Sequence, residues 1–207
     1  MSSLNQKPKS LPEAVDLIRT LIAQSLHEDD PFVILIDGRA GSGKTTLATA
    51  LADQLEDCLL VHLDDYFLRP HQRTAERLSI PGGNVDAERL IDQLVCPLLH
   101  GEEGIIEPWS CSEQRFLEKR TVSVPRILIL EGSYAMNDWT NPFGDLRIFV
   151  TCSPAIQQQA ILNRSSAKVL EQFNQKWIPL EENYFEKDHI PDRADLILDL
   201  DNLHPDA

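Results

Sequence analysis

The chain has 207 residues, of which 42% are hydrophobic and 25% charged, proportions typical of a globular protein rather than a disordered or fibrous one. Its 33 acidic and 19 basic residues give a net charge of −14, so no broad positive field attracts nucleic acid or an anionic membrane surface. The longest apolar runs are too short to cross a bilayer, and the polar start MSSLNQKPKS lacks the apolar core of a secretory signal. We therefore expect neither a nucleic-acid nor a membrane partner.

Strands alternate with helices along the chain. Apolar residues at helical spacing predict an amphipathic helix at 11–27, which could cover a sheet or join two protomers into a homo-oligomer, and further helices at 47–55 and 87–98. Short continuous apolar runs predict strands that are buried on both faces, at 32–37, 58–63, 126–131, 146–151 and 194–200. This alternation predicts an α/β fold with a mostly parallel central sheet and helices on both faces.

Two segments depart from this alternation. Residues 104–124 carry two short strand patterns with a polar link between them, which predicts a small β-hairpin insertion beside the main sheet. Residues 154–187 form a long helical region, the candidate lid, with an expected break near Pro179. No internal repeat or low-complexity segment is present, and we expect a single domain over 1–207.

The four cysteines are scattered along the chain, without the close or repeated spacing of a zinc site or a disulfide framework. They are Cys58, Cys96, Cys111 and Cys152. We interpret them as reduced, separately packed thiols, and on that basis we expect a cytoplasmic protein. His62 lies inside a predicted strand and is interpreted as a core histidine.

A phosphate-binding loop follows the first predicted strand directly. The segment GRAGSGKTT matches the pattern G-x-x-x-x-G-K-[ST], in which glycines let successive backbone N–H groups turn toward a phosphate. Lys44 would reach the outer phosphates of ATP, and Thr45 would offer its hydroxyl to Mg²⁺. The residues predicted to bind the nucleotide are Gly38, Arg39, Ala40, Gly41, Ser42, Gly43, Lys44, Thr45 and Thr46.

Two acidic residues are expected beside this loop, because ligands of open α/β sheets lie beyond the carboxyl ends of the strands. Asp64 follows one predicted strand, with Asp65 next to it, and Glu131 ends another. Phosphoryl transfer uses one acid to orient and deprotonate the attacking hydroxyl and another on the metal side. We assign the first role to Asp64, with Asp65 as the alternative, and the second to Glu131.

These motifs resemble those of the uridine kinase and phosphoribulokinase-like group of P-loop kinases. The phosphate loop, DDYF, NVDAERL and EGSYA occur in the order and approximate spacing of that family, and the resemblance extends from about Phe32 to the final strand. It implies a three-layer P-loop kinase fold with a small hairpin and lid insertion. It also implies that Asp64 is the base, that Asp86 holds sugar hydroxyls and that Glu131 is the strand-terminal acid.

The acceptor and lid regions depart from the family pattern. Uridine kinases carry an aromatic residue and then a histidine that read the pyrimidine, whereas EPWSCSEQRF offers Trp109 and no histidine. The family's lid is rich in arginine, but here only Arg164 and Lys168 occupy that stretch, and we assign the lid role to Arg164 with Lys168 as the alternative.

Other residues complete the expected acceptor site. Tyr66, Phe67 and Trp109 could line it by stacking, and Arg69, Arg73 and Arg115 could neutralise an anionic acceptor. The hypothesis is an ATP- and Mg²⁺-dependent kinase that phosphorylates a hydroxyl of a small molecule, with a nucleoside as the first candidate. Pantothenate, a sugar phosphate or another vitamin or sugar stays open as acceptor, and so does a nucleotide-dependent regulatory ATPase.

Overall fold

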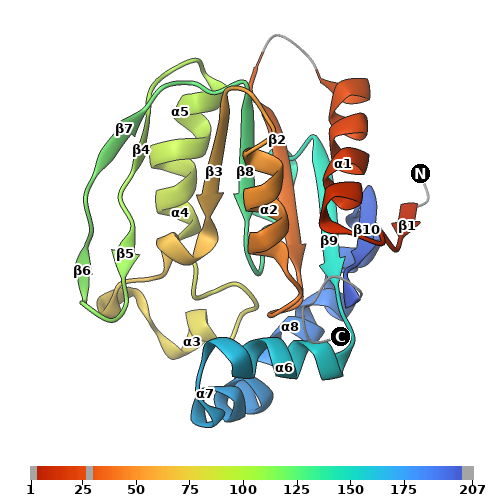
Figure 1. Cartoon of the computed structure of the whole chain (residues 1–207). Coiled ribbons are helices and arrows are strands. Elements are labelled where there is room, and N and C mark those ends of the chain that lie inside the picture. The colour runs from red at the N-terminus through yellow and green to blue at the C-terminus, as the bar shows by residue number, and fades with distance from the viewer. Residues whose placement is uncertain (1–3, 27–29, 202–207) are drawn as a thin grey trace.

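The computed structural model describes residues 4–26 and 30–201. Six parallel strands form the central sheet, in the order β1-β10-β9-β2-β8-β3. Their bounds are β1 (Leu4–Gln6), β2 (Phe32–Gly38), β3 (Cys58–His62), β8 (Ile127–Glu131), β9 (Leu146–Thr151) and β10 (Leu196–Asp199). The predicted α/β fold with its parallel sheet is confirmed, and in Figure 1 the sheet runs through the centre of the molecule.

Helices cover both faces of this sheet. Their bounds are α1 (Leu11–Ser25), α2 (Lys44–Ala52), α3 (Ala75–Leu78), α4 (Ala87–Leu90), α5 (Cys96–Leu99), α6 (Pro154–Arg164), α7 (Ala167–Gln172), α8 (Ile178–Lys187) and α9 (Ile190–Arg193). A π-helical turn, Ile91–Val95, joins α4 to α5, and a second, Phe173–Trp177, joins α7 to α8. Short 3₁₀ turns occupy Leu63–Tyr66, Pro70–Gln72 and Asn141–Phe143.

The side chains of β2 alternate between two hydrophobic cores. Phe32, Ile34 and Ile36 pack with α1 and α2 on one face of the sheet. Val33 and Leu35 pack on the other face, with residues of α4, α5 and α8. Since all seven residues of β2 are buried, this strand lies in the middle layer of three, which explains its continuous apolar sequence.

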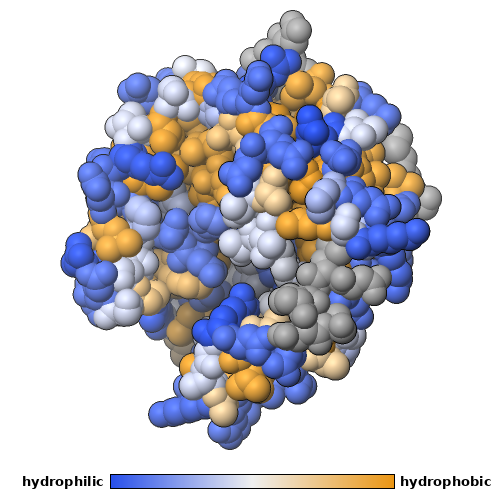
Figure 2. All heavy atoms as spheres, viewed as in Figure 1, coloured by the Kyte–Doolittle hydropathy of each residue, from blue (hydrophilic) through white to orange (hydrophobic). Residues whose placement is uncertain are grey.

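The strands of the sheet lead toward the end of the molecule where α3, α6, α7 and α8 gather (Figure 1). The chain between β3 and β8 includes two small antiparallel ribbons, which lie along one side of the molecule (Figure 1). One pairs β4 (Gly104–Ile106) with β7 (Arg120–Val122), and the other pairs β5 (Trp109–Ser110) with β6 (Arg115–Phe116). The expected hairpin insertion is therefore present. On the side of the molecule seen in Figures 1 and 2, the surface carries hydrophilic residues with hydrophobic patches among them (Figure 2).

Three details differ from the sequence-based expectation. Strand β1, which pairs in parallel with β10, was not predicted because three exposed residues carry no periodic signal. The helix expected at 11–27 ends at Ser25, and residue 27 lies outside the described residues. The helical region expected at 154–187 has an irregularity near Pro179, as predicted, because the π-helical turn Phe173–Trp177 ends two residues before that proline. A second interruption was not predicted: it falls at Ser165, which is extended, and Ser166, which caps α7.

No helix within the described residues is both long and apolar enough to span a membrane. The four cysteines are free, and only Cys152 is fully buried.

Candidate active site

The phosphate-binding loop joins β2 to α2, as the sequence predicts. Gly43 immediately precedes α2 in the left-handed conformation, with φ 92°, which a residue with a side chain adopts only with strain. Gly38 has φ 140°, and a Cβ atom there would lie 1.9 Å from the carbonyl oxygen of Val150. The glycines at both ends of the loop are therefore required by the backbone path that turns the chain from the sheet into the helix.

Lys44 is buried beneath this loop. Its Nζ donates hydrogen bonds to the carbonyl oxygens of Gly38 and Arg39, each at 2.8 Å. The hydroxyl of Ser42 is buried and has no hydrogen-bond partner among the described residues. An ammonium group held at the loop, an unpaired buried hydroxyl and left-handed glycines fit a polyphosphate, whose oxygens accept hydrogen bonds.

Glu131, at the end of β8, links the loop to the neighbouring strand. Thr45 Oγ1 donates to the Glu131 carboxylate, 3.1 Å from Oε1 and 3.4 Å from Oε2. His62 is the register neighbour of Glu131 on β3, and its Nδ1 lies 2.5 Å from Oε1. This hydrogen bond is the main reason that the pKa of His62 is raised.

The interpretation of His62 as a core histidine is wrong. Its side chain is 38% exposed and contacts the acidic residue of the site instead of packing in the interior. The strand pairing that makes His62 and Glu131 neighbours is a tertiary feature. A polar residue two positions before Asp64, in an otherwise apolar strand, was the one available signal.

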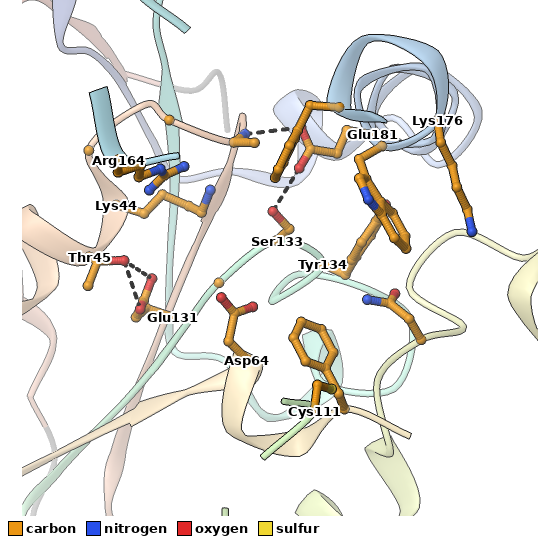
Figure 3. A pocket seen from close by; sticks show the side chains of 18 of the residues that line it. Lys44, Thr45, Asp64, Cys111, Glu131, Ser133, Tyr134, Arg164, Lys176 and Glu181 are labelled. Atoms are coloured by element: carbon orange, nitrogen blue, oxygen red, sulfur yellow. Dashed lines mark hydrogen bonds between the residues drawn. The ribbon is translucent and has the colours of Figure 1, made fainter. Parts of the chain in front are cut away.

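Asp64 lies just beyond the carboxyl end of β3, in the turn Leu63–Tyr66. Its carboxyl lines the same cavity as Lys44, Thr45 and Glu131 (Figure 3). Burial is the largest cause of its raised pKa, the negative charge of Glu131 raises the pKa further, and Lys44 opposes both. Asp65 does not line this cavity, so the geometry favours Asp64 over Asp65 as the base.

The fit to Mg²⁺ rests on oxygen donors. The Thr45 hydroxyl and the Glu131 carboxylate lie together beside the loop, and these are the ligand atoms that Mg²⁺ takes. Within the described ranges, no group of three or more His, Cys, Asp or Glu residues is arranged to hold a metal ion. The chain would therefore hold Mg²⁺ by a few protein oxygens together with those of a bound phosphate, which is how this ion is usually bound.

The cavity has a volume of about 560 Å³ and extends from the phosphate loop to the helices on the far side. Arg164, the last residue of α6, lines it, whereas Lys168 does not. The lining also includes Arg73, Lys176 and Trp177. Figure 3 shows Arg164 beside the loop with Lys44, and Lys176 on the other side of the pocket.

Glu181, on α8, was missed by sequence reasoning. Glu181 is 4% exposed. Its carboxylate accepts one hydrogen bond from the Ala40 backbone N–H at 3.0 Å and another from Ser133 Oγ at 2.8 Å (Figure 3). Beside it, Glu182 forms an ion pair with Arg39. These contacts fasten α8 to the phosphate loop. In the sequence, Glu181 is one of two adjacent glutamates in a charged helix, with nothing to single it out.

Asp37 and Tyr184 add a buried hydrogen bond to this attachment. Tyr184 Oη donates to Asp37 Oδ2 at 2.7 Å. The Asp37 carboxylate also accepts from the backbone N–H groups of Gly38, Tyr134 and Met136, at 2.6, 3.1 and 2.8 Å. Asp37 therefore joins β2, the loop after β8 and α8 at one point.

Several residues expected at the acceptor site do not line the cavity. Tyr66 is fully buried, and the guanidinium of Arg89 lies 4.5 Å from its ring centre. Asp86 caps α4 and is 2% exposed, Trp109 packs edge-on against Phe116, and Arg115 pairs with Glu113 at the surface. The aromatic residues that line the cavity are Phe67, which was expected there, and Tyr134, Phe173 and Trp177, which were not.

Comparison with known proteins places this site in a wider context. No family model matches the chain. Over 142 residues the chain is 27% identical to the inorganic pyrophosphatase TTM2 of Arabidopsis thaliana, a segment that is 65% of the chain and 20% of that protein. The chain thus spans about a fifth of the length of the curated relatives it matches.

Solved structures resemble the chain over most of its length. A possible uridine kinase from Bacillus stearothermophilus superposes with a TM-score of 0.70 at 23% identity, covering 91% of this chain and 99% of that one. A D-glycerate 3-kinase from Cryptococcus neoformans superposes with a TM-score of 0.62 at 13% identity, covering 92% and 95%. The six-stranded parallel sheet, the phosphate loop and these likenesses together show that the chain has the α/β fold of the uridine kinase-like P-loop kinases.

Proposed function

We propose that the chain transfers a phosphoryl group from ATP to a hydroxyl of a small molecule. The observation that supports this most directly is that Asp64 and the phosphate loop line one cavity, with Glu131 and Thr45 between them. A base near the phosphoryl donor and a space for an acceptor are the two requirements of a kinase that positions its reactants. The fold is compatible with this activity but does not by itself specify it.

In this proposal each residue has one task. Asp64 accepts the proton of the acceptor hydroxyl as the new O–P bond forms and the bond to the leaving ADP oxygen breaks. Lys44 and Arg164 stabilise the negative charge on the transferring group. Thr45 and Glu131 would hold Mg²⁺, which when bound neutralises charge on the phosphate oxygens. His62 orients the Glu131 carboxylate through its hydrogen bond.

The identity of the acceptor is a separate matter. The motif resemblance favours a nucleoside, and Phe67, Tyr134 and Trp177 could stack on a base within the cavity. Pantothenate or a sugar phosphate is the alternative within kinases. A regulatory ATPase is the alternative outside them, and it would hydrolyse ATP at a rate independent of any small acceptor.

The test compares Asp64→Asn, Asp65→Asn and Lys44→Ala in an acceptor-dependent ADP-release assay, with ATP binding measured in parallel by calorimetry. We expect Asp64→Asn to bind ATP nearly as the parent protein does while turnover falls about 10²- to 10⁴-fold, the usual contribution of a general base. Lys44→Ala should weaken both binding and turnover, because its ammonium contacts the phosphates in both states.

Asp65→Asn is the matched control, since Asp65 belongs to the same motif and lies outside the cavity lining. Near-normal turnover in Asp64→Asn, with loss in Asp65→Asn, would transfer the base role to Asp65. ADP release that no acceptor accelerates would contradict the kinase proposal and favour the ATPase.

A further inference from the structure

The acidic side chains that line the cavity already have defined roles. Glu131 is bound by Thr45 and His62, and Glu181 is bound by the Ala40 N–H and Ser133. Asp64 faces the place of the reacting hydroxyl. No further Asp or Glu lines the cavity in the described part of the chain.

The basic side chains of the cavity divide into two pairs. Lys44 and Arg164 lie at the phosphate-loop side, where the charge of the donor explains them (Figure 3). Arg73 and Lys176 also line the cavity. Figure 3 shows Lys176 across the pocket from Lys44. Arg73 contacts Cys111, which lies on the other side of Asp64 from Lys44 in the same view. The donor alone therefore does not account for this second pair.

Arg73 is held in place without a neutralising partner. Its Nε donates to the carbonyl oxygen of Leu68 at 2.8 Å, and its Nη2 lies 3.1 Å from Cys111 Sγ. These contacts orient the guanidinium but leave its charge uncompensated. Over 4–26 and 30–201, neither Arg73 nor Lys176 forms an ion pair with a carboxylate.

The ammonium group of Lys176 lies against an aromatic ring. Its Nζ lies 4.5 Å from the ring centre of Trp177, the adjacent residue of the cavity wall. An ammonium group over an aromatic face keeps its three N–H donors available for an incoming anion.

Asp86, which the motif resemblance assigns to sugar hydroxyls, is occupied by other cations. It is 2% exposed and pairs with Arg89 at 3.5 Å and Arg69 at 3.8 Å. In a chain whose net charge is −14, two cations that line one cavity without an ion-pair partner among the described residues are a local reversal of the overall charge.

We propose that the acceptor is an anionic alcohol, whose carboxylate or phosphate binds Arg73 and Lys176 while its hydroxyl faces Asp64. This rests on the proposed function and specifies its substrate class. Arginine forms paired N–H···O hydrogen bonds with either anion, and lysine supplies a compact positive charge. A neutral nucleoside would leave both cations without a counter-ion, so the two cations together select against it.

The experiment measures ADP release by the full chain with three sets of acceptors at equal concentration. The neutral set is uridine and cytidine, the carboxylate set is glycerate and pantothenate, and the phosphate set is ribulose 5-phosphate and ribose 5-phosphate. We expect kcat/KM for at least one anionic set to exceed that of the neutral set tenfold or more. Which anionic set responds distinguishes carboxylate from phosphate recognition.

The charge variants Arg73→Gln and Lys176→Gln test the assigned residues. Each should raise the KM for the anionic acceptor about tenfold or more and leave the KM for ATP within twofold. Both residues are exposed enough that neither substitution empties the core. Arg19→Gln, which removes an exposed cation on α1 outside the cavity, is the matched control and should change neither constant.

Two outcomes would overturn this inference and leave the kinase proposal standing. One is efficient turnover of the neutral set with no response to Arg73→Gln or Lys176→Gln. The other is turnover of an anionic acceptor whose KM is unchanged in both variants.

If no acceptor stimulates ADP release, the proposed function fails, and binding decides the inference separately. The same six compounds are then titrated calorimetrically into the parent chain and the two charge variants. Binding of an anion that weakens tenfold in the variants supports the anion site. No binding of any anion overturns it.

Discussion

The two sides of the cavity are built in different ways. The donor side consists of backbone turns and buried side chains at the ends of β2 and β8, where Lys44, Glu131 and Asp37 each have several internal partners. The acceptor side is formed by short segments and by side chains such as Arg73 and Lys176 that remain exposed. The first side is held by backbone turns and buried hydrogen bonds, whereas the second has fewer internal contacts that a substitution would disturb.

Asp37 shows how tightly the donor side is constrained. It is completely buried, and burial raises its pKa although hydrogen bonds from Met136, Tyr184 and Gly38 and the positive charge of Lys44 oppose that effect. A buried carboxylate is costly unless its hydrogen-bonding capacity is filled. Its presence therefore marks a junction at which the strand, the loop after β8 and α8 are joined.

The largest expected difference between the two sides is in stability, and Asp37→Asn should show it. The amide group would place N–H donors against backbone N–H groups that now find an acceptor, so we expect a loss of about 1–3 kcal/mol in the free energy of unfolding. Tyr184→Phe removes one donor and leaves the carboxylate one bond short, with an expected loss of about 1 kcal/mol.

Urea denaturation followed by circular dichroism measures both values. Lys176→Gln serves as the acceptor-side control, because Lys176 lines the cavity, is exposed and contacts the Trp177 ring, so its loss should change stability by less than about 1 kcal/mol. Equal stabilities for Asp37→Asn and Lys176→Gln would contradict the distinction between a rigid donor side and a tolerant acceptor side.

The second prediction concerns the contact that joins the two sides. Glu181→Ala removes the acceptor for the Ala40 N–H and for Ser133 Oγ, and so weakens the attachment to the phosphate loop of α8, which follows Lys176 and Trp177. The Glu182–Arg39 and Tyr184–Asp37 contacts remain. We expect a roughly tenfold fall in kcat/KM for the acceptor, because a loss of about 1.4 kcal/mol in positioning corresponds to that factor. Steady-state kinetics with each substrate varied in turn separates acceptor from ATP effects.

Glu181→Gln is the conservative partner of that variant. Its side-chain oxygen can still accept from Ala40 and its amide can donate to Ser133, so kcat/KM should stay within about threefold of the parent value. If the glutamine and alanine variants lose activity equally, the negative charge of Glu181, and not its hydrogen-bonding geometry, is what the site needs.

The smallest effect is expected in the pH profile. Burial and the charge of Glu131 raise the pKa of Asp64, and a base acts only when it is ionised. As pH falls, kcat/KM should therefore decline at a pH above that at which an ordinary aspartate is protonated, and it should recover as pH rises through the pKa of Asp64. The profile is measured with both substrates below their KM, so that it reports the free chain, in which no bound Mg²⁺ offsets the charge of Glu131. An acid limb at the ordinary aspartate value would contradict the assigned environment.

The predictable parts of the site are those carried by short-range patterns. Gly38, Gly43, Lys44 and Thr45 act within one loop, and their spacing alone indicates a phosphate site. Asp64 and Glu131 were found because the ends of parallel strands meet at one edge of the sheet. Tyr66, Asp86, Trp109 and Arg115 were assigned to the acceptor site from the motif resemblance or from their residue type in the expected acceptor loops. They do not line the cavity, since each packs or pairs elsewhere.

The amino-acid sequence determined the order of strands and helices, the phosphate loop and the acids at two strand ends, because hydrophobic periodicity and backbone torsion are local properties. Only the tertiary structure decided that His62 contacts Glu131, that Glu181 binds the phosphate loop and that Arg73 and Lys176 share one cavity. These contacts join residues that are distant along the chain. Their partners depend on how the helices pack over the ends of the strands, which no local pattern encodes.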